Sequence, residues 1–140
     1  MKSGAGAIFV CTTTKRTLLN LRSPHKTHNL NWGLWGGMVE DGESPVECLK
    51  REITEEAGFL PEISKIYPFD IYQSKNKQFS FYTFVCIVEE EFIPKINSES
   101  AGYGWFDTGV WPKPLHSGVK QCFTTKKGKQ LLEIILSQHT

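Results

Sequence analysis

Three glutamates in the segment REITEEAGF, residues 51–59, have a spacing that could hold a divalent cation. Glu52, Glu55 and Glu56 are three and four positions apart, so on an α-helix, which turns about 100° per residue, they would share one face. Like charges at this spacing repel by roughly 0.2–0.5 kcal/mol per pair. Bound Mg²⁺ would remove that repulsion, because this cation prefers oxygen ligands such as carboxylates and substrate phosphates. A solvated charged face is the alternative, and the spacing alone leaves both interpretations open.

The residues around these glutamates predict the helix that would hold them. Ser44 is a favoured N-cap, Pro45 suits the first helical position, and Glu47 completes an S-x-x-E capping box. Gly58 suits a left-handed stop at the C-terminal end. Apolar residues at helical spacing would bury one side of the helix, and these are Val46, Leu49, Ile53 and Ala57. A helix anchored in this way would give the carboxylates a rigid base.

Apolar and β-branched segments on both sides of this helix predict a sheet. The predicted strands are 4–11, 17–22, 66–72, 78–88 and 103–107, and further helices are predicted at 115–122 and 127–138. Strands combined with two or three helices indicate an α/β fold, in which a mixed β-sheet is flanked by helices. The sequence contains neither an internal repeat nor a linker, so a single domain is expected over residues 1–140.

A longer pattern around the helix is more specific than the three glutamates. Residues 37–59 read GMVEDGESPVECLKREITEEAGF. This segment resembles the Nudix box, G-x5-E-x7-R-E-U-x-E-E-x-G-U, in which U is an aliphatic or bulky apolar residue. Every specified position matches, from Gly37 to Phe59. The resemblance implies the Nudix α/β/α sandwich and a hydrolase that uses Mg²⁺ or Mn²⁺ to cleave a diphosphate linkage.

The resemblance also assigns roles to the charged residues of the box. Glu52, Glu55 and Glu56 would be metal ligands, and in several relatives the backbone carbonyl at the position of Gly36 completes the metal shell. In some members the residue that matches Glu52 is instead the general base or positions it. Arg51 would orient the carboxylates, because its planar guanidinium suits paired hydrogen bonds to carboxylate oxygens.

Three positions of the box are expected to have structural roles. Glu43 looks more like a partner of the helix, or a positioner of Arg51, than a metal ligand. Gly37 and Gly42 lie in a loop that must wrap round the start of the helix, which calls for positive φ or a close backbone approach. Gly58 is expected to end the helix.

A second acidic candidate lies outside the box. Glu99 precedes Trp105 by six residues in the segment NSESAGYGWF. Many Nudix proteins have a loop glutamate before a similar strand, and there it binds metal or acts as the general base. The resemblance therefore implies a catalytic or metal-binding role for Glu99, and an ordinary exposed loop glutamate is the alternative.

Nudix substrates are usually nucleoside diphosphates linked to another group, and two kinds of side chain could hold one here. Arg22 and Lys26 could contact phosphate oxygens or be solvated surface residues. Aromatic rings could stack on a base, and the available rings are Trp32, Trp35, Tyr72, Phe81 and Tyr103. Core packing is the alternative for each ring, and it is less easily applied to the two tryptophans of the glycine-rich segment that enters the box. No role is assigned to the scattered histidines, of which His116 has the most interest.

Composition limits the classes of partner. The chain has 140 residues with 16 basic and 15 acidic side chains, so no overall field directs it to nucleic acid or a membrane. No apolar run approaches the ~20 residues of a membrane span. Four separated cysteines fit a reducing compartment, which predicts a cytoplasmic protein. A small nucleotide is the expected partner, and a homodimer is suggested only by analogy with relatives.

Two alternatives to a small-molecule hydrolase stay open. A Nudix-like sensor would bind a nucleotide without hydrolysing it, although such modules usually lose box carboxylates that are all present here. A pyrophosphohydrolase that processes RNA ends would need a basic patch, for which residues 126–129 are the candidate. The substrate stays open among dinucleoside polyphosphates, ADP-ribose, nucleoside triphosphates, FAD or NADH, nucleotide sugars and capped RNA ends.

Overall fold

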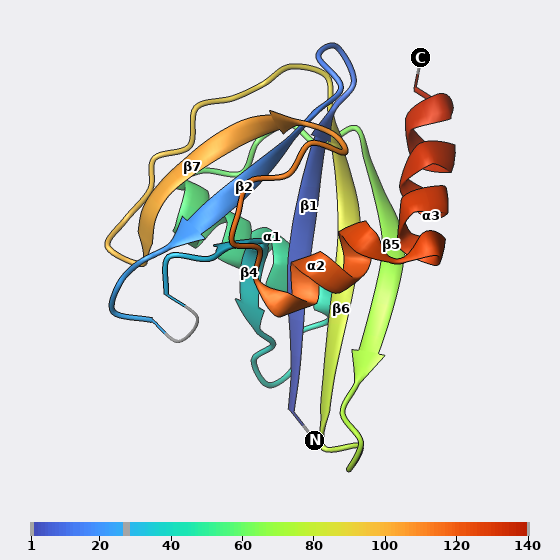
Figure 1. The fold of residues 1–140 in the computed structure, drawn as a ribbon. Helices are drawn as coiled ribbons and strands as arrows, with labels where there is room; N and C mark the ends of the chain where they lie inside the picture. Colours follow the sequence, from blue (N-terminus) through green and yellow to red (C-terminus); the bar gives the residue numbers. More distant parts are fainter. Residues whose placement is uncertain (1, 27–28, 140) are drawn as a thin grey trace.

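The computed structural model describes residues 2–26 and 29–139, which form a seven-stranded mixed sheet and three helices (Figure 1). The elements in chain order are β1 (Lys2–Cys11), β2 (Arg16–Arg22), β3 (Trp32–Gly33), β4 (Trp35–Met38), α1 (Pro45–Ala57), β5 (Lys65–Gln73), β6 (Phe79–Val88), β7 (Ser100–Asp107), α2 (Ser117–Thr124) and α3 (Lys126–Ser137). The predicted strands and helices are all present. The sequence interpretation missed β3 and β4, because their glycine-rich segment lacks the β-branched pattern that marks a strand.

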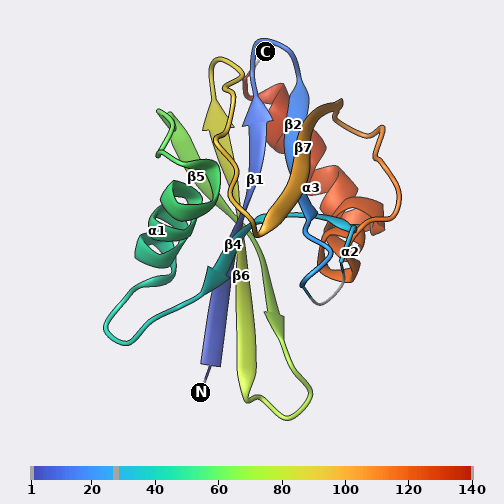
Figure 2. The same ribbon diagram turned by 90° about the vertical axis from the view of Figure 1, so that its left-hand side faces the viewer.

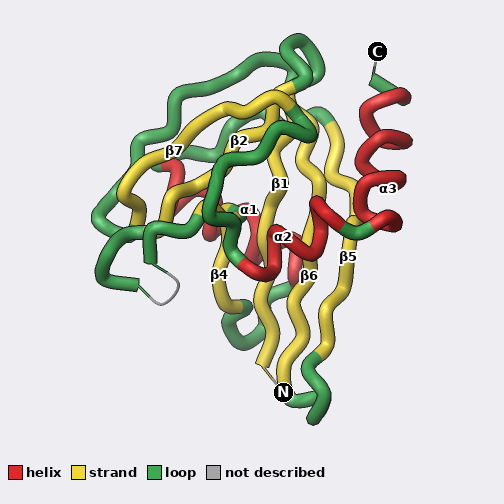
Figure 3. The backbone as a smooth tube through the Cα atoms, viewed as in Figure 1, coloured by secondary structure: helices red, strands yellow, loops and turns green. Residues whose placement is uncertain are grey.

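The sheet is arranged around β1. Its strand order is β3-β2-β1-β6-β5, with β4 paired to β1 and β7 paired to β2. β1 and β6 are parallel along their whole length, and every other pairing is antiparallel. β2 pairs with the C-terminal part of β1, whereas β4 pairs with residues 4–7 near its beginning. As Figure 3 shows, β4 is therefore a short strand beside one half of β1.

The helices cover opposite faces of this sheet. Figure 2 shows α1 on one face and α2 and α3 on the other. Because side chains alternate along a strand, β1 contributes to two separate cores. Ala5, Ala7 and Phe9 lie in the core on the α1 face, while Ile8 and Val10 lie in the core on the α2 and α3 face. The predicted mixed sheet flanked by helices, an α/β/α sandwich, is confirmed.

The approach of β4 to β1 is so close that position 36 requires glycine. A Cβ atom added at Gly36 would lie 2.0 Å from the backbone oxygen of Ala5 and 2.6 Å from Cα of Gly6. Both neighbours are backbone atoms, so a side chain could enter only if one strand moved. Gly102 in β7 offers a comparison, because a Cβ atom there would meet nothing nearer than Cδ2 of Leu21 at 3.9 Å.

We expect Gly36→Ala to lower the free energy of unfolding by about 2 kcal/mol or more, because overpacking against backbone forces a strand shift. Urea unfolding followed by far-ultraviolet circular dichroism measures this change. The matched variant Gly102→Ala adds the same methyl group to another strand and should change stability by less than about 1 kcal/mol. Equal losses in the two variants would show that the strand approach is not the cause.

Candidate active site

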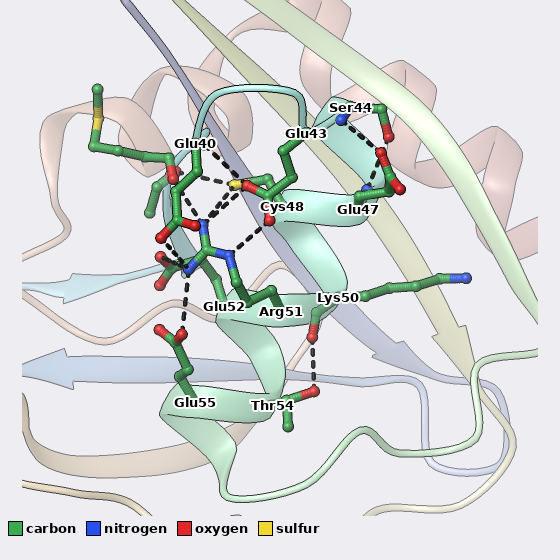
Figure 4. A network of polar contacts seen from close by, with 12 residues as sticks. Glu40, Glu43, Ser44, Glu47, Cys48, Lys50, Arg51, Glu52, Thr54 and Glu55 are labelled. Atoms are coloured by element: carbon green, nitrogen blue, oxygen red, sulfur yellow. Dashed lines mark hydrogen bonds and ion pairs between the residues drawn. The ribbon is translucent and has the colours of Figure 1, made fainter.

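α1, which carries the three glutamates of the sequence motif, is held at both ends. The Oγ atom of Ser44 accepts the Glu47 N–H at 3.1 Å, and the Ser44 N–H donates to the Glu47 carboxylate at 2.8 Å (Figure 4). Gly58 ends the helix with φ of 84°, a left-handed conformation that glycine adopts without strain. Leu49 and Ile53 are fully buried against the sheet. The predicted capping box, stop and apolar stripe are thus confirmed.

The helix places its three glutamates in different environments. Glu56 is only 6% exposed, and its Oε1 atom accepts the Gly36 N–H at 2.6 Å. Glu52 is half-buried, and its carboxylate lies against Gly37, where an added Cβ atom would be 2.5 Å from the carboxylate carbon. Glu55 is 56% exposed. Two of the three carboxylates therefore face β4, and the third stays at the surface.

Arg51 connects these carboxylates to the loop that precedes α1. Its Nε and Nη2 atoms donate to the two carboxylate oxygens of Glu43 at 2.7 and 3.0 Å, and Nη2 also donates to the Met38 carbonyl at 2.9 Å (Figure 4). Its Nη1 atom donates to Glu52 at 2.9 Å and to Glu55 at 3.3 Å. These hydrogen bonds from Arg51 lower the pKa of Glu43 to about 2. Glu43 is thus a partner of Arg51, as the sequence indicates.

Glu99 lies in the loop before β7, next to the C-terminal half of α1. The Glu99 N–H donates to Oδ1 of Asn97 at 2.8 Å, and Nδ2 of Asn97 donates to the Glu55 carbonyl at 3.0 Å. The Glu99 carboxylate is 3.7 Å from Nζ of Lys26 and is about half exposed. Its charge contributes to the raised pKa of both carboxylates that face β4, which places it near them. Sequence reasoning missed Asn97, because its hydrogen bond to the Glu55 carbonyl joins residues that are 42 positions apart.

Burial makes Glu56 the most unusual carboxyl group of the site. Burial raises the pKa of Glu56 to about 8, repulsion from Glu52 adds to the increase, and the Gly36 N–H opposes it. Burial likewise raises the pKa of Glu52, whereas its hydrogen bond with Arg51 lowers it. In the described residues no basic side chain forms an ion pair with Glu56. A buried carboxylate in this position needs either a proton or a cation.

The metal-free protein should become less stable as the pH rises from about 5 to about 8. The folded state keeps the Glu56 proton up to about pH 8, whereas the unfolded chain loses it near the ordinary value of 4.5, so the folded state binds more protons in this window. The loss can reach about 1.4 kcal/mol per pH unit. Urea unfolding at each pH in a chelator measures it, and the slope should be much smaller in Glu56→Gln. Equal slopes in both proteins would contradict this assignment.

The donor groups of the site suit a hard divalent cation. No set of three or more His, Cys, Asp or Glu side chains within residues 2–26 and 29–139 is already arranged to hold a metal ion. However, the Glu52 and Glu56 carboxylates face β4, Glu55 and Glu99 lie nearby, and the buried Glu56 has no ion-pair partner among the described residues. The Gly36 N–H points to Glu56, and the N–H and C=O of one strand residue point to the same side, so the Gly36 carbonyl faces the carboxylates too. Oxygen ligands of this kind are those that Mg²⁺ prefers.

A cavity of about 560 Å³ lies on the α2 face of the sheet and reaches the same strand. Residues on its wall include Arg22, Asp70, Tyr72, Phe79, Phe81 and His116. Gly36 and Gly37 also line it, and Gly37 touches the Glu52 carboxylate on its other side. Because neither glycine has a side chain, the cavity and the carboxylates adjoin at β4. A ligand could therefore contact both.

The structure separates the aromatic residues that were expected to bind substrate. Trp35 is fully buried in the core on the α1 face, because β4 pairs with β1, and its ring N–H donates to a β2 carbonyl at 3.2 Å. Its ring thus offers no surface to a ligand. Trp32 packs against Phe106 with ring centroids 5.0 Å apart, and Tyr103 is 37% exposed on β7. Neither lines the cavity, whereas Arg22 does.

Comparison with known proteins identifies the family. The sequence model of the NUDIX domain matches residues 2–123, which is most of the chain. The chain belongs to the NUDIX family. It is therefore a Nudix hydrolase, an enzyme of the class that cleaves diphosphate linkages in nucleoside diphosphate derivatives. A comparison with curated proteins found no match.

Solved structures of other Nudix proteins have the same fold. The Nudix hydrolase RenU from M. smegmatis has a TM-score of 0.73 at 23% identity, covering 96% of this chain and 86% of that chain. The MutT NUDIX hydrolase from Burkholderia pseudomallei has a TM-score of 0.67 at 23% identity, covering 89% and 98%. A UDP-X diphosphatase has a TM-score of 0.68 at 24% identity, covering 99% and 64%. At these identities the similarity supports the fold, and not a shared substrate.

None of the helices in the described residues is long and apolar enough to span a membrane.

Proposed function

We propose that this Nudix hydrolase depends on Mg²⁺ or Mn²⁺ and cleaves the diphosphate linkage of a nucleoside diphosphate joined to another group. The observation that carries the proposal is the buried Glu56 carboxylate, which has no ion-pair partner in residues 2–26 and 29–139 and lies where β4 separates the acidic side chains from the cavity. The residues that would hold the metal are Glu52, Glu55, Glu56, Glu99 and the Gly36 carbonyl. A bound metal would neutralise phosphate charge and lower the pKa of its water.

Other residues of the site would position the metal ligands, accept a proton and bind phosphate. Arg51 holds Glu52 and Glu55 by hydrogen bonds, and this keeps their carboxylates in place before substrate arrives. Glu52 and Glu99 are the two candidates to accept the proton of the attacking water, because their side chains keep some exposure, 15% and 52%, whereas Glu56 is buried. Arg22 lines the cavity close to β4, where its charge would bind phosphate oxygens.

A substrate panel tests the proposal directly. Wild-type protein is incubated with dinucleoside polyphosphates, ADP-ribose, nucleotide sugars, nucleoside triphosphates, NADH, FAD and capped RNA ends, in Mg²⁺, Mn²⁺ or a chelator. Release of mononucleotide or phosphate is measured for each. We expect turnover of at least one compound with added metal, and none in the chelator. Turnover that persists in the chelator would exclude the metal. Tight binding without turnover on every compound would favour the nucleotide sensor instead.

A further inference from the structure

Two glycines of β1 allow an aromatic ring to lie at the floor of the cavity. A Cβ atom at Gly4 would be 2.9 Å from Cδ1 of Phe81, and one at Gly6 would be 2.9 Å from Cζ of the same ring. The Phe81 ring thus occupies the space that side chains at both positions would fill, and it rests against the β1 backbone. Phe81 is half-buried and lines the cavity, so part of the ring is available to a ligand. Such a surface suits a planar heterocycle.

An irregularity in β5 places an acidic side chain on the wall of this cavity. The register between β5 and β6 shifts between Pro68 and Asp70, so Phe69 is an extra residue in β5. Asp70 consequently lies opposite Thr83, whose side chain lines the cavity. Without the extra residue, Asp70 would lie opposite Tyr82, which packs on the α1 face of the sheet. The Asp70 side chain would then point away from the cavity. Bulges are known to redirect side chains beside active sites.

The Asp70 carboxylate has no hydrogen bond or ion pair with any of the described residues. Its position beside α2 is reflected in Cys122, another cavity residue. Burial raises the pKa of the Cys122 thiol to about 11, and the Asp70 charge adds to the increase. An ionised aspartate can only accept hydrogen bonds, through two oxygens. Asp70 is exposed, so its carboxylate oxygens are open to a ligand that enters the cavity, whose wall also includes Phe81.

We propose that Asp70 is a specificity-determining residue, which accepts a hydrogen bond from an amino group on the substrate's heterocyclic base while that base lies against Phe81. This inference rests on the proposed function, because it assigns the cavity to the nucleoside part of the substrate. An exocyclic amino group donates to the carboxylate, whereas an exocyclic carbonyl oxygen at the same place would be repelled by it. Substrates with an amino-bearing base, such as adenine, guanine or cytosine, are thus favoured over their oxo or unsubstituted counterparts.

Nucleoside monophosphates test Asp70 without any hydrolysis, because they contain no diphosphate linkage. Affinities are measured by NMR titration of the ¹⁵N-labelled full chain in Mg²⁺ with three matched pairs: GMP and IMP, AMP and IMP, and CMP and UMP. Each pair differs at one amino position. We expect at least one amino-bearing member to bind roughly tenfold or more tightly than its counterpart, the scale of a hydrogen bond to a charged group. Shifts should include the amide of Phe81.

Two variants separate the roles of the carboxylate and the ring. In Asp70→Asn the amide both donates and accepts, so the preference should fall to less than about threefold. Asp70→Ser provides the same test should the amide disturb folding. Phe81→Leu should weaken the binding of both nucleotides of a pair and leave the ratio of their affinities unchanged. Glu133→Gln removes a carboxylate from the exposed face of α3, outside the cavity. It should change neither the affinities of the monophosphates nor the preference within a pair.

The outcomes distinguish this inference from the proposed function. Equal affinities within all three pairs, a preference that survives Asp70→Asn and Asp70→Ser, or shifts confined to residues away from the cavity would each overturn the role of Asp70. Turnover of the substrate panel is measured on the same preparation. A base preference without turnover would overturn the proposed hydrolysis and keep Asp70 as a binding residue. Turnover without a base preference would overturn the role of Asp70 and keep the proposed hydrolysis.

Discussion

Glu56→Gln is expected to reduce metal-dependent turnover by roughly a hundredfold or more, the scale of a lost acid–base or metal contribution. Glutamine has nearly the same shape as glutamate, and its Oε1 atom can still accept the Gly36 N–H that now meets the carboxylate at 2.6 Å. The substitution therefore removes the negative charge and leaves the local packing. Initial rates at saturating Mg²⁺, on whichever substrate the panel identifies, measure the loss.

Two controls separate lost chemistry from lost structure. Glu62→Gln changes the net charge by the same amount at an exposed position after α1, and its rate should equal that of wild type. In a chelator at pH 8, Glu56→Gln should be at least as stable as wild type, because wild-type Glu56 must then either hold a proton that the unfolded chain has lost or bury a charge, and glutamine does neither. Wild-type rates in Glu56→Gln would refute the role of this carboxylate in the reaction.

Arg51→Lys should lower turnover by about ten- to hundredfold, the range seen when a group that orients metal ligands is replaced. One guanidinium makes two bonds to Glu43 and one each to Glu52 and Glu55. Lysine keeps the charge but lacks the planar set of donors, so it cannot hold all three carboxylates at once. Because Arg51 acts through these carboxylates, the Mg²⁺ concentration that gives half-maximal activity should rise as well.

The chain contains a matched control for this substitution. Arg16 also makes a two-bond pairing with a carboxylate, donating to Glu91 at 2.7 Å from both Nε and Nη2. That pair lies outside the carboxylate group and the cavity, so Arg16→Lys should leave both the rate and the Mg²⁺ dependence unchanged. A rate loss in Arg51→Lys without any change in Mg²⁺ dependence would argue that Arg51 contacts the substrate instead of positioning metal ligands.

Residues 44–58 encode α1 and its acidic face without help from the rest of the chain. The capping pair Ser44 and Glu47, the stop at Gly58 and the apolar stripe are all encoded within 15 consecutive residues, and the capping pair acts through contacts within one helical turn. The pairing of Arg51 with Glu43 spans only eight residues. Local rules are sufficient for such features, and they predicted the bounds of α1 and the presence of a mixed sheet, whereas the family was identified from the resemblance of residues 37–59 to the Nudix box.

The residues that surround α1 and the cavity come from distant parts of the chain, and their positions depend on strand pairing and loop contacts. Trp35 was expected near a substrate, but the antiparallel pairing of β4 with β1 turns its ring into the core. Glu56 meets Gly36 across 20 residues, and Asn97 ties its loop to α1 across 42. Asp70 reaches the cavity only because β5 contains one extra residue. Strand pairing and register place Trp35 and Asp70, and a change of one residue in register would turn each of these two side chains to the opposite face of the sheet.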